Sequence, residues 1–319
     1  MGWSWLWRRL ASVVVVLLLV SFAAYALLDL LPGSTATAIL GTGATPDAVA
    51  QVEADLHLDR PMPVRYMLWL QRAVNGDLGV SYQSGEVINT AVRPRVGMSL
   101  ELLVLTQLFA AGVALPLSLL AARNENGRLD RLVSAGSFVA IALPQVAFGI
   151  ILLTVFAVKL RWFPATRYVP FGTSPVQNLR ALVLPVLSLG LPLAGIYTRV
   201  LRTDLLQTMA SDHITFARAM GLPTRRVLLG RVLRPSSLTL VSVIGLNTAF
   251  VLGGAAIVEQ LFSLPGVGSF LLRAVLFRDF VKVQAAVLVI AVIYVVVNLA
   301  IDVALTLLDP RIRLTRSGK

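Results

Sequence analysis

The stretch that decides the fold is VQAAVLVIAVIYVVVNLAI, residues 283–301. It holds no charged residue, and a hydrocarbon core about 30 Å thick is crossed by about 20 helical residues, so it predicts a membrane-spanning helix. Further uncharged apolar runs occupy Leu10–Leu28, Leu102–Ala122, Leu132–Val158, Ala181–Thr198 and Pro235–Val258. Together these runs predict an all-α polytopic membrane protein with about six transmembrane helices.

The composition of the 319-residue chain agrees with this fold class. Hydrophobic residues make up 57% and charged residues 14%, whereas about a quarter of the residues in a soluble domain are charged. The absence of cysteine excludes disulfides, thiolate nucleophiles and cysteine metal sites. The net charge of +12 reflects an excess of basic residues, and in membrane proteins such an excess usually lies in cytoplasmic loops beside anionic lipid. We therefore expect membrane lipid, and no nucleic acid, as a partner.

Some runs allow alternatives. Leu10–Leu28 follows two arginines, as a signal peptide would, but its length exceeds the usual ~7–15 apolar residues and no clean cleavage site follows. The runs at 132–158 and 283–301 are the least ambiguous in length, whereas 181–198 contains two prolines and fits a span least well. Prolines inside the runs predict kinks at Pro116, Pro144, Pro185 and Pro192.

The distribution of Lys and Arg predicts the orientation. With the N-terminus in the cytoplasm, six spans place 16 basic residues inside and 12 outside, and five of those 12 lie in one long loop that the positive-inside rule discounts. We therefore expect both termini inside. The expected regions are residues 1–31 with the first span, an external loop subdomain at 32–97, and a transmembrane core at 98–319 that includes an inner loop at 202–234 and a C-terminal tail at 308–319.

The external loop is too long for a simple connector. A helix capped by Thr45 or Asp47 would end at Pro61–Pro63. A second helix over 64–74 would carry its aromatic residues on one side, and Asn75-Gly76 would then turn the chain. This pattern predicts an ordered external subdomain, which is either a cap over the spans or a docking surface for an external protein.

The inner loop, residues 202–234, combines six arginines with a regular apolar spacing. A short helix can start after a cap at Ser211 or Asp212 and run to Met220, where Gly221 suits the C-cap position. A second helix then leads into the fifth span. The short helix suits a groove of another protein or a layer of lipid headgroups, and the spacing leaves both interpretations open.

Four stretches in chain order carry a family resemblance. They are LDRPMPVRYMLWL with GDLGVSY (58–82), DHITFARAMGLPTRRVLLGRVLRPSS (212–237), IVEQLFSLPGVGSFLLRAVLFRDF (257–280) and DPRIRL (309–314). These stretches resemble the membrane subunits of ABC importers, in particular the dipeptide, oligopeptide and nickel permease branch. That branch commonly reads ARAKGL where this chain has residues 217–222. In the general Glu-Ala-Ala-x-x-x-Gly loop, Ala217 and Gly221 match, Thr215 and Phe216 depart, and Pro235 sits one residue late.

The resemblance implies the type I importer permease fold in the cytoplasmic (inner) membrane. It implies as partners a second, homologous permease subunit, two cytoplasmic ATPases that bind ATP and Mg²⁺, and an extracytoplasmic solute-binding protein. The two permease subunits would form the pathway for peptides that the binding protein delivers. The short inner helix would couple the ATPases to the spans, and small Ala217 would press against an ATPase groove.

Three groups of site residues follow from the resemblance. The ATPase-coupling group is Asp212, Thr215, Phe216, Ala217, Arg218, Ala219, Met220 and Gly221. The external docking group is Asp59, Arg60, Pro61, Tyr66, Trp69, Asp77 and Gly79. The outer-mouth group, expected to form a turn into a short re-entrant helix, is Glu259, Phe262, Pro265, Gly266 and Gly268.

The residues argue against catalysis in this chain. A phosphate loop needs G-x-x-x-x-G-K-[ST], and the one Gly-Lys pair is Gly318-Lys319. His57 and His213 fall on opposite predicted sides of the membrane, which argues against a Ser/His dyad within the spans and against a histidine metal site. We expect no catalytic residue, metal or cofactor here, and ATP hydrolysis in separate subunits.

An ion-gradient-driven transporter or channel working alone is the alternative function. Such proteins usually have internal repeats and several ionisable groups near the midplane, and neither is evident. Asp302, in the last span, more readily snorkels or pairs with a cation than relays protons. The other polar residues within spans, Gln145, Asn247 and Asn298, are expected to bond between helices.

Overall fold

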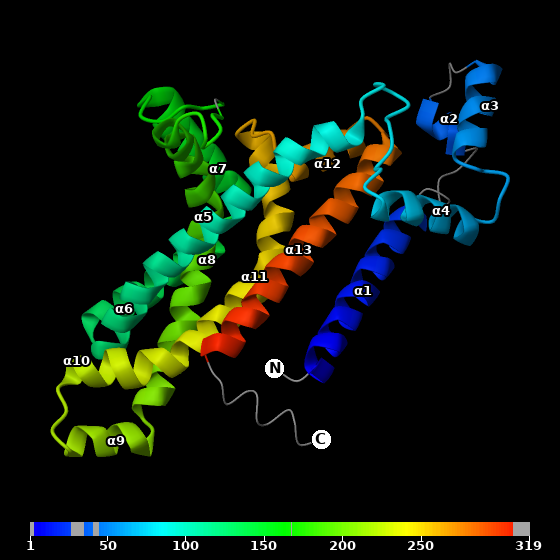
Figure 1. Ribbon diagram of the computed structural model, residues 1–319. Coiled ribbons are helices and arrows are strands. Elements are labelled where there is room, and N and C mark those ends of the chain that lie inside the picture. Colours follow the sequence, from blue (N-terminus) through cyan, green and yellow to red (C-terminus); the bar gives the residue numbers. More distant parts are fainter. Residues whose placement is uncertain (1–2, 27–34, 41–44, 167, 309–319) are drawn as a thin grey trace. The chain divides into compact units, whose positions relative to one another are not determined.

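The structure, a computed structural model (Figure 1), describes residues 3–26, 35–40, 45–166 and 168–308. The described residues are almost all helical, and their one extended pairing is an isolated bridge between Val80 and Val87. Two compact units are present, unit 1 (Met1–Leu100 with Leu264–Val295) and unit 2 (Glu101–Ser263 with Val296–Lys319). The helices, with η for π-helical segments, are α1 (Trp3–Ala26), α2 (Thr35–Leu40), α3 (Pro46–Asp55), α4 (Met62–Val74), α5 (Ile88–Arg123), α6 (Arg128–Ala142), α7 (Gln145–Leu152), η1 (Leu153–Lys159), α8 (Pro175–Met209), α9 (Asp212–Ala219), α10 (Thr224–Val227), η2 (Leu228–Val232), α11 (Leu233–Leu261), α12 (Val267–Leu276) and α13 (Phe280–Leu308).

The apolar helices confirm the polytopic membrane class. Four of them, α5, α8, the continuous run Arg225–Leu261 and α13, are long and apolar enough to cross a bilayer. The pair Arg128–Ala142 and Gln145–Lys159 meets the same criterion with a bend of 96°, as in a broken span or a re-entrant loop. The first predicted run lies in α1, whose apolar part is Ala11–Ala26; its last two residues are outside the described ones.

The third predicted span, 132–158, is the main correction. It is not one helix, because α6 ends at Ala142 and α7 begins at Gln145 at the 96° bend. Proline has no N–H and disfavours a helical conformation at the preceding residue. Leu143 accordingly has an extended backbone, with φ −73° and ψ 119°, directly before Pro144. The predicted kink at Pro144 is therefore confirmed, and the run forms a bent pair of helices instead of one straight helix.

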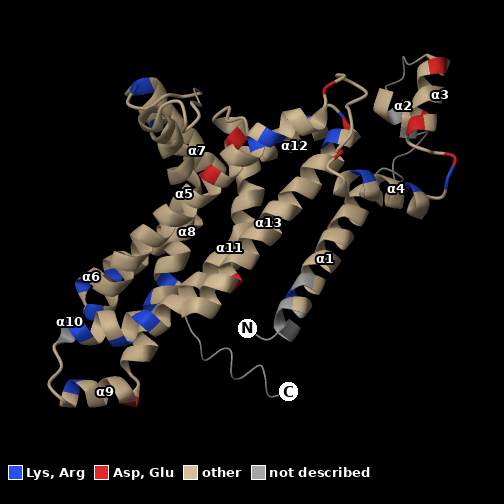
Figure 2. Ribbon diagram, in the orientation of Figure 1, with Lys and Arg blue, Asp and Glu red and all other residues tan. Residues whose placement is uncertain are grey.

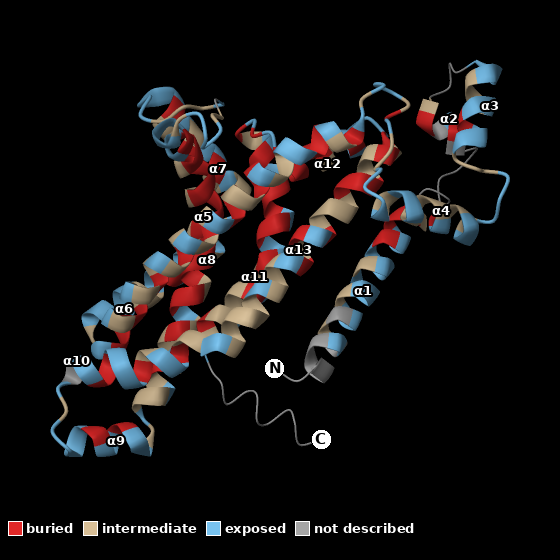
Figure 3. Ribbon diagram, viewed as in Figure 1, coloured by how far each residue is buried: buried red, intermediate tan, exposed pale blue. Residues whose placement is uncertain are grey.

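The fourth predicted span shows the opposite behaviour. α8 continues through Pro185 and Pro192 over 35 residues, and 67% of its most apolar window is buried. Figure 3 shows buried residues along this helix. A Cβ added at Gly190 would lie 2.6 Å from the Phe109 ring, and one at Gly195 would lie 2.7 Å from the Ser137 carbonyl oxygen. α8 is thus the packed centre of unit 2, and close neighbours on several sides hold it helical despite its prolines.

The fifth predicted span begins earlier than its apolar run. Pro235 lies inside α11 instead of at its start, and the π-helical segment η2 comes shortly before it. A proline leaves the carbonyl four residues earlier without its helical partner. Here that residue is Arg231, which lies in η2. The wider helical turn therefore occurs where the proline disrupts the regular ladder.

Unit 1 contains most of the predicted external subdomain. Thr45 caps α3, with its side-chain oxygen accepting from the Ala48 N–H at 3.4 Å. α3 ends at Asp55, before the expected stop at Pro61–Pro63, whereas α4 matches the predicted second helix and ends in a turn at Gly76 with φ +84°. α5 starts at Ile88, so the last part of the predicted loop at 32–97 is helical. α2 and α3 share a small core formed by Ala36, Ile39 and Val52.

Candidate functional site

The short inner helix α9 is defined at both ends by its sequence. Ser211 takes the N-cap conformation, with φ −75° and ψ 151°. At the other end the Gly221 N–H donates to the Arg218 carbonyl at 2.9 Å, and the Leu222 N–H donates to the Ala217 carbonyl at 3.3 Å. This pair of bonds is a Schellman motif, which requires positive φ at the glycine. Gly221 has φ +76°, so its predicted role in stopping the helix is confirmed.

The two faces of α9 have different surroundings. Ile214 and Ala217 are buried against the chain itself, with exposures of 0% and 1%. The predicted contact between Ala217 and an ATPase groove is therefore corrected: Ala217 supports the helix from behind. The outward side carries two large apolar residues, Phe216 at 66% and Met220 at 68% exposure. The other exposed members of the coupling group are Asp212, Thr215, Arg218, Ala219 and Gly221.

The surroundings of α9 are basic and are tied together by polar contacts. Figure 2 shows Lys and Arg residues where α6 begins, on α9 and on α10. The Arg202 guanidinium at the end of α8 makes a two-pronged pair with Asp130 on α6, in which Nη2 lies 2.7 Å from Oδ2. Asp130 is 4% exposed and also accepts from the Asn126 N–H at 2.9 Å. A hydroxyl pair, Thr208 to Ser236 at 3.3 Å, joins α8 to α11.

The sequence pattern did not predict the Asp130–Arg202 pair. The two residues are 72 positions apart, and each lies among several other charged residues near the end of a span. Their position at the ends of adjacent apolar runs was the one available signal. The pair matters because it fixes the first half of the bent span to the helix that leads directly to α9.

The external docking group separates into two kinds of residue. Asp59, Arg60 and Pro61 are exposed between α3 and α4. Tyr66 is instead 7% exposed, its hydroxyl lies 2.9 Å from that of Ser21 on α1, and its ring is stacked with Trp69 at 6.1 Å between centroids. This second kind of residue holds α4 against α1.

Asp77 and Gly79, like Tyr66, make contacts within the chain itself. The Gly79 N–H donates to the Asp77 carboxylate at 2.9 Å, and Gly79 has φ +87°. A Cβ there would lie 3.4 Å from Val281. These residues shape the segment that connects α4 to α5, and Asp77 is exposed there, as the tip at Asp59, Arg60 and Pro61 is between α3 and α4.

The outer-mouth group forms the expected turn into a short helix, α12. Gly266 is the N-cap of α12, and its N–H donates to the Ser269 hydroxyl at 3.3 Å. Ser269 donates in turn to the Leu264 carbonyl at 2.9 Å. Glu259 and Phe262 are buried, at 1% and 2% exposure; Gly268 is buried and Pro265 exposed.

A charged cluster next to α12 was also missed. Lys282 lies 2.9 Å from the Glu86 carboxylate and 3.3 Å from that of Asp279, and the Ser81 hydroxyl donates to Asp279 at 2.6 Å. Arg95 stacks over the Phe270 ring at 4.9 Å. All of these residues except Ser81 line a hollow of about 360 Å³. They come from distant parts of the sequence, so no local pattern predicted it.

The polar residues within spans serve local packing. Asn247 donates to the Val243 carbonyl of its own helix at 2.9 Å, so its expected bond between helices is wrong. A Cβ added to Gly254 would lie 2.5 Å from the Gln145 amide nitrogen. The Ser188 hydroxyl donates to the Gln145 backbone carbonyl at 2.8 Å. Within the described residues, no group of His, Asp and Glu side chains is suited to hold a metal ion.

Comparison with known families and relatives covers nearly the whole chain. Residues 114–314 match the family described as binding-protein-dependent transport system inner membrane component, and residues 3–102 match that described as its N-terminal membrane component. A putative peptide transport system permease protein of Brucella abortus (strain 2308) is 32% identical over 306 residues, which are 96% of this chain and 98% of the relative. The glutathione transport system permease protein GsiC of Salmonella paratyphi A is 30% identical, covering 96% and 97%.

More distant matches agree with these. The dipeptide transport system permease protein DppB of Alkalihalophilus pseudofirmus is 29% identical over 326 residues, covering 96% of this chain and 98% of the relative. A chain of the inward-facing MetNI methionine ABC transporter superposes with a TM-score of 0.56 at 18% identity, covering 68% of this chain and 96% of the other. This last likeness concerns the fold.

Proposed function

Because the chain belongs to the family of binding-protein-dependent transport system inner membrane components, we propose that it is the permease subunit of an ATP-driven importer of short peptides. It is a transport component of the inner membrane and not a catalytic subunit. One observation carries the mechanism: α9 ends in a Schellman motif at Gly221 and exposes the apolar side chains of Phe216 and Met220 beside several arginines.

The partners follow from the division of labour in such a system. A solute-binding protein delivers the cargo from outside, and ATPases supply the energy from the cytoplasm. Two ATPase subunits bind ATP and Mg²⁺, and a second, homologous permease subunit forms the other half of the pathway. Both termini and the loop 202–234 face the cytoplasm, in agreement with the excess of basic residues there.

Coupling proceeds through the contacts that surround α9. An ATPase groove receives Phe216 and Met220, as grooves receive the apolar face of other short helices. Closure of the ATPases then displaces α9 and, with it, the end of α8. From α8 the displacement reaches α11 through the Thr208–Ser236 contact and α6 through the Arg202–Asp130 pair.

Short peptides are the proposed cargo because the relatives that align over almost the entire chain are named for peptide, dipeptide and glutathione transport. Glutathione is itself a short peptide, so the three names share one chemical class. The exposed tip at Asp59, Arg60 and Pro61 is the proposed contact for the peptide-loaded binding protein.

The test is uptake by the assembled complex in vesicles. The chain is reconstituted with the second permease subunit, both ATPases and the binding protein, and entry of labelled Ala-Phe is measured. Uptake is expected to need ATP and loaded binding protein, and to persist when an ionophore abolishes ion gradients. Peptide uptake by this chain alone, driven by a gradient without ATPases, would support the secondary-transporter alternative instead.

A further inference from the structure

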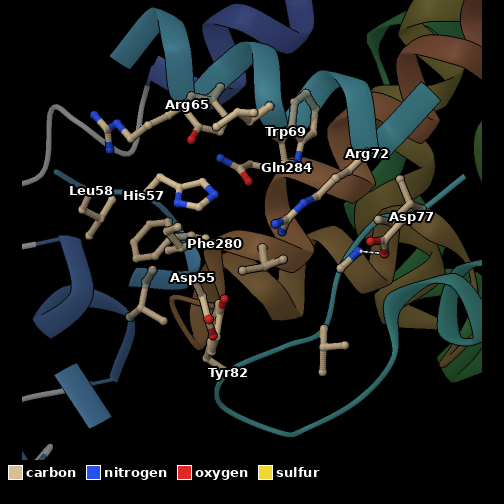
Figure 4. Close-up of a pocket in the computed structure, with 18 residues that line it drawn as sticks. Asp55, His57, Leu58, Arg65, Trp69, Arg72, Asp77, Tyr82, Phe280 and Gln284 are labelled. Atoms are coloured by element: carbon tan, nitrogen blue, oxygen red, sulfur yellow. Dashed lines mark hydrogen bonds between the residues drawn. The ribbon is translucent and has the colours of Figure 1, made fainter. Parts of the chain in front are cut away.

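A cavity of about 350 Å³ lies inside unit 1 (Figure 4). Its walls come from α1, α2, the end of α3 and the residues 56–58 that follow it, from α4, from the segment at residues 77–82 and from the start of α13. This volume falls in the range of pockets that hold small organic ligands, about 300–1,000 Å³. The cavity is built from elements of a single compact unit, and none of its lining residues belongs to the coupling helix α9.

One buried side chain in this cavity indicates that a ligand binds there. Gln284 is 5% exposed, and among the described residues its Nε2 has no hydrogen-bond partner. Leaving a buried amide donor without an acceptor costs about 1–3 kcal/mol. In Figure 4 the Gln284 amide projects into the cavity, which the imidazole of His57 also lines. An oxygen acceptor from a bound molecule would satisfy it.

The charged residues around the cavity indicate which charged groups the bound molecule carries. Arg72 is exposed at the cavity and forms no ion pair within the described part of the chain. A guanidinium and an amide donor together suit a carboxylate. Asp55 and Asp77 supply negative charge on the same walls. Burial raises the pKa of Tyr82, and the Asp55 carboxylate adds to that effect, so Tyr82 stays a neutral hydroxyl beside Asp55.

The remaining walls are apolar and aromatic. Trp69 and Phe280 flank the polar groups, with Leu68 and Val281 nearby. A ligand that satisfies all of these surfaces carries a carboxylate, a cation and an apolar side chain. A free anion would leave the apolar walls uncovered and would bring no cation to Asp55 and Asp77, and an apolar molecule would leave Gln284 unsatisfied.

We propose that this cavity of unit 1 binds a short peptide with a free C-terminus. The peptide carboxylate accepts hydrogen bonds from Gln284 Nε2 and pairs with Arg72, its ammonium group faces Asp55, and its side chain lies against Trp69 and Phe280. The choice of a peptide over a single amino acid rests on the proposed function.

The test is equilibrium binding of Ala-Phe to the purified full-length chain in lipid nanodiscs, measured by calorimetry without ATPases or binding protein. Saturable binding is expected, and Arg72→Gln and Gln284→Leu each weaken it by about tenfold or more. Ala-Phe-amide, which lacks the carboxylate, is expected to bind weakly as well. The matched controls, Arg93→Gln and Gln71→Leu, change exposed residues outside the cavity and leave the affinity unchanged.

Several outcomes would overturn the proposal. These are no saturable binding, equal binding of Ala-Phe and its amide, or wild-type affinity in Arg72→Gln. Arg72 is exposed, so its replacement leaves the fold intact and decides the matter even when Gln284→Leu does not fold. Binding of phenylalanine without binding of Ala-Phe would overturn the peptide assignment. Because no transport is measured, a failure of peptide uptake in the assembled complex remains a separate result.

Discussion

The inner loop around α9 and the external subdomain of α2 to α4 differ in the burial of their aromatic side chains. α9 exposes Phe216 and Met220 and buries only its small supporting face. The external subdomain buries Tyr66 and stacks it on Trp69, in contact with α1. The inner loop therefore presents a surface that needs a partner, whereas most of the external aromatic residues already have one within the chain.

The largest effect is expected when carboxylates replace exposed apolar residues in each of the two regions. Phe216→Asp combined with Met220→Asp places carboxylates on the apolar face of α9, which should abolish co-purification of the ATPases. The control is Val74→Asp at the end of α4, where an equally exposed apolar residue, at 79% exposure, is replaced. Retention of the ATPases by the double variant, or their loss from Val74→Asp, would contradict the assigned roles.

The next effect concerns backbone geometry. Gly221→Val strains a position with φ +76° by about 1 kcal/mol or more and disrupts the end of α9. We expect the ATPase activity that loaded binding protein stimulates to fall by about tenfold or more. Gly76→Val introduces the same strain in the external turn, at φ +84°. It should lower stability without this uncoupling, and equal uncoupling in both variants would remove the distinction.

A smaller effect is expected for two ion pairs of different burial. Asp130→Asn removes the charge that faces Arg202 from a residue with 4% exposure, which should lower the free energy of unfolding by about 2 kcal/mol. Glu86→Gln removes a partner of Lys282 whose side chain is 40% exposed, and the expected change is about 0.5 kcal/mol or less. Thermal unfolding of the purified chain compares them, and a larger loss for Glu86→Gln would refute this ranking.

How far the sequence could predict the fold is clearest from its prolines. The run at 132–158 had no competing interpretation by length, yet it breaks at exposed Pro144. The run at 181–198 fitted a span least well, yet α8 continues through two prolines. A proline removes the same hydrogen bond in both. The difference is that α8 is enclosed by neighbouring helices, and tertiary packing is not encoded in a local window.

In the candidate site, too, some features were predictable from the sequence and others were not. The start of α9, its end at Gly221 and the turn at Gly76 were predictable because caps and positive φ depend on adjacent residues. The burial of Ala217, the Asp130–Arg202 pair and the cavity around Gln284 were not, because each depends on contacts between distant segments. Periodicity placed residues on a helix face but could not say which face meets the chain itself.

The most direct test of the coupling role uses the absence of cysteine from this chain. Single cysteines at Phe216, Met220 and Ala217 are introduced, and the assembled complex is treated with a short bifunctional thiol and amine cross-linker. We predict that Phe216→Cys and Met220→Cys become linked to an ATPase subunit, whereas Ala217→Cys, at a position with 1% exposure, does not. Linkage from neither exposed position, or equal linkage from Ala217→Cys, would contradict the proposal that α9 inserts its apolar face into the ATPase.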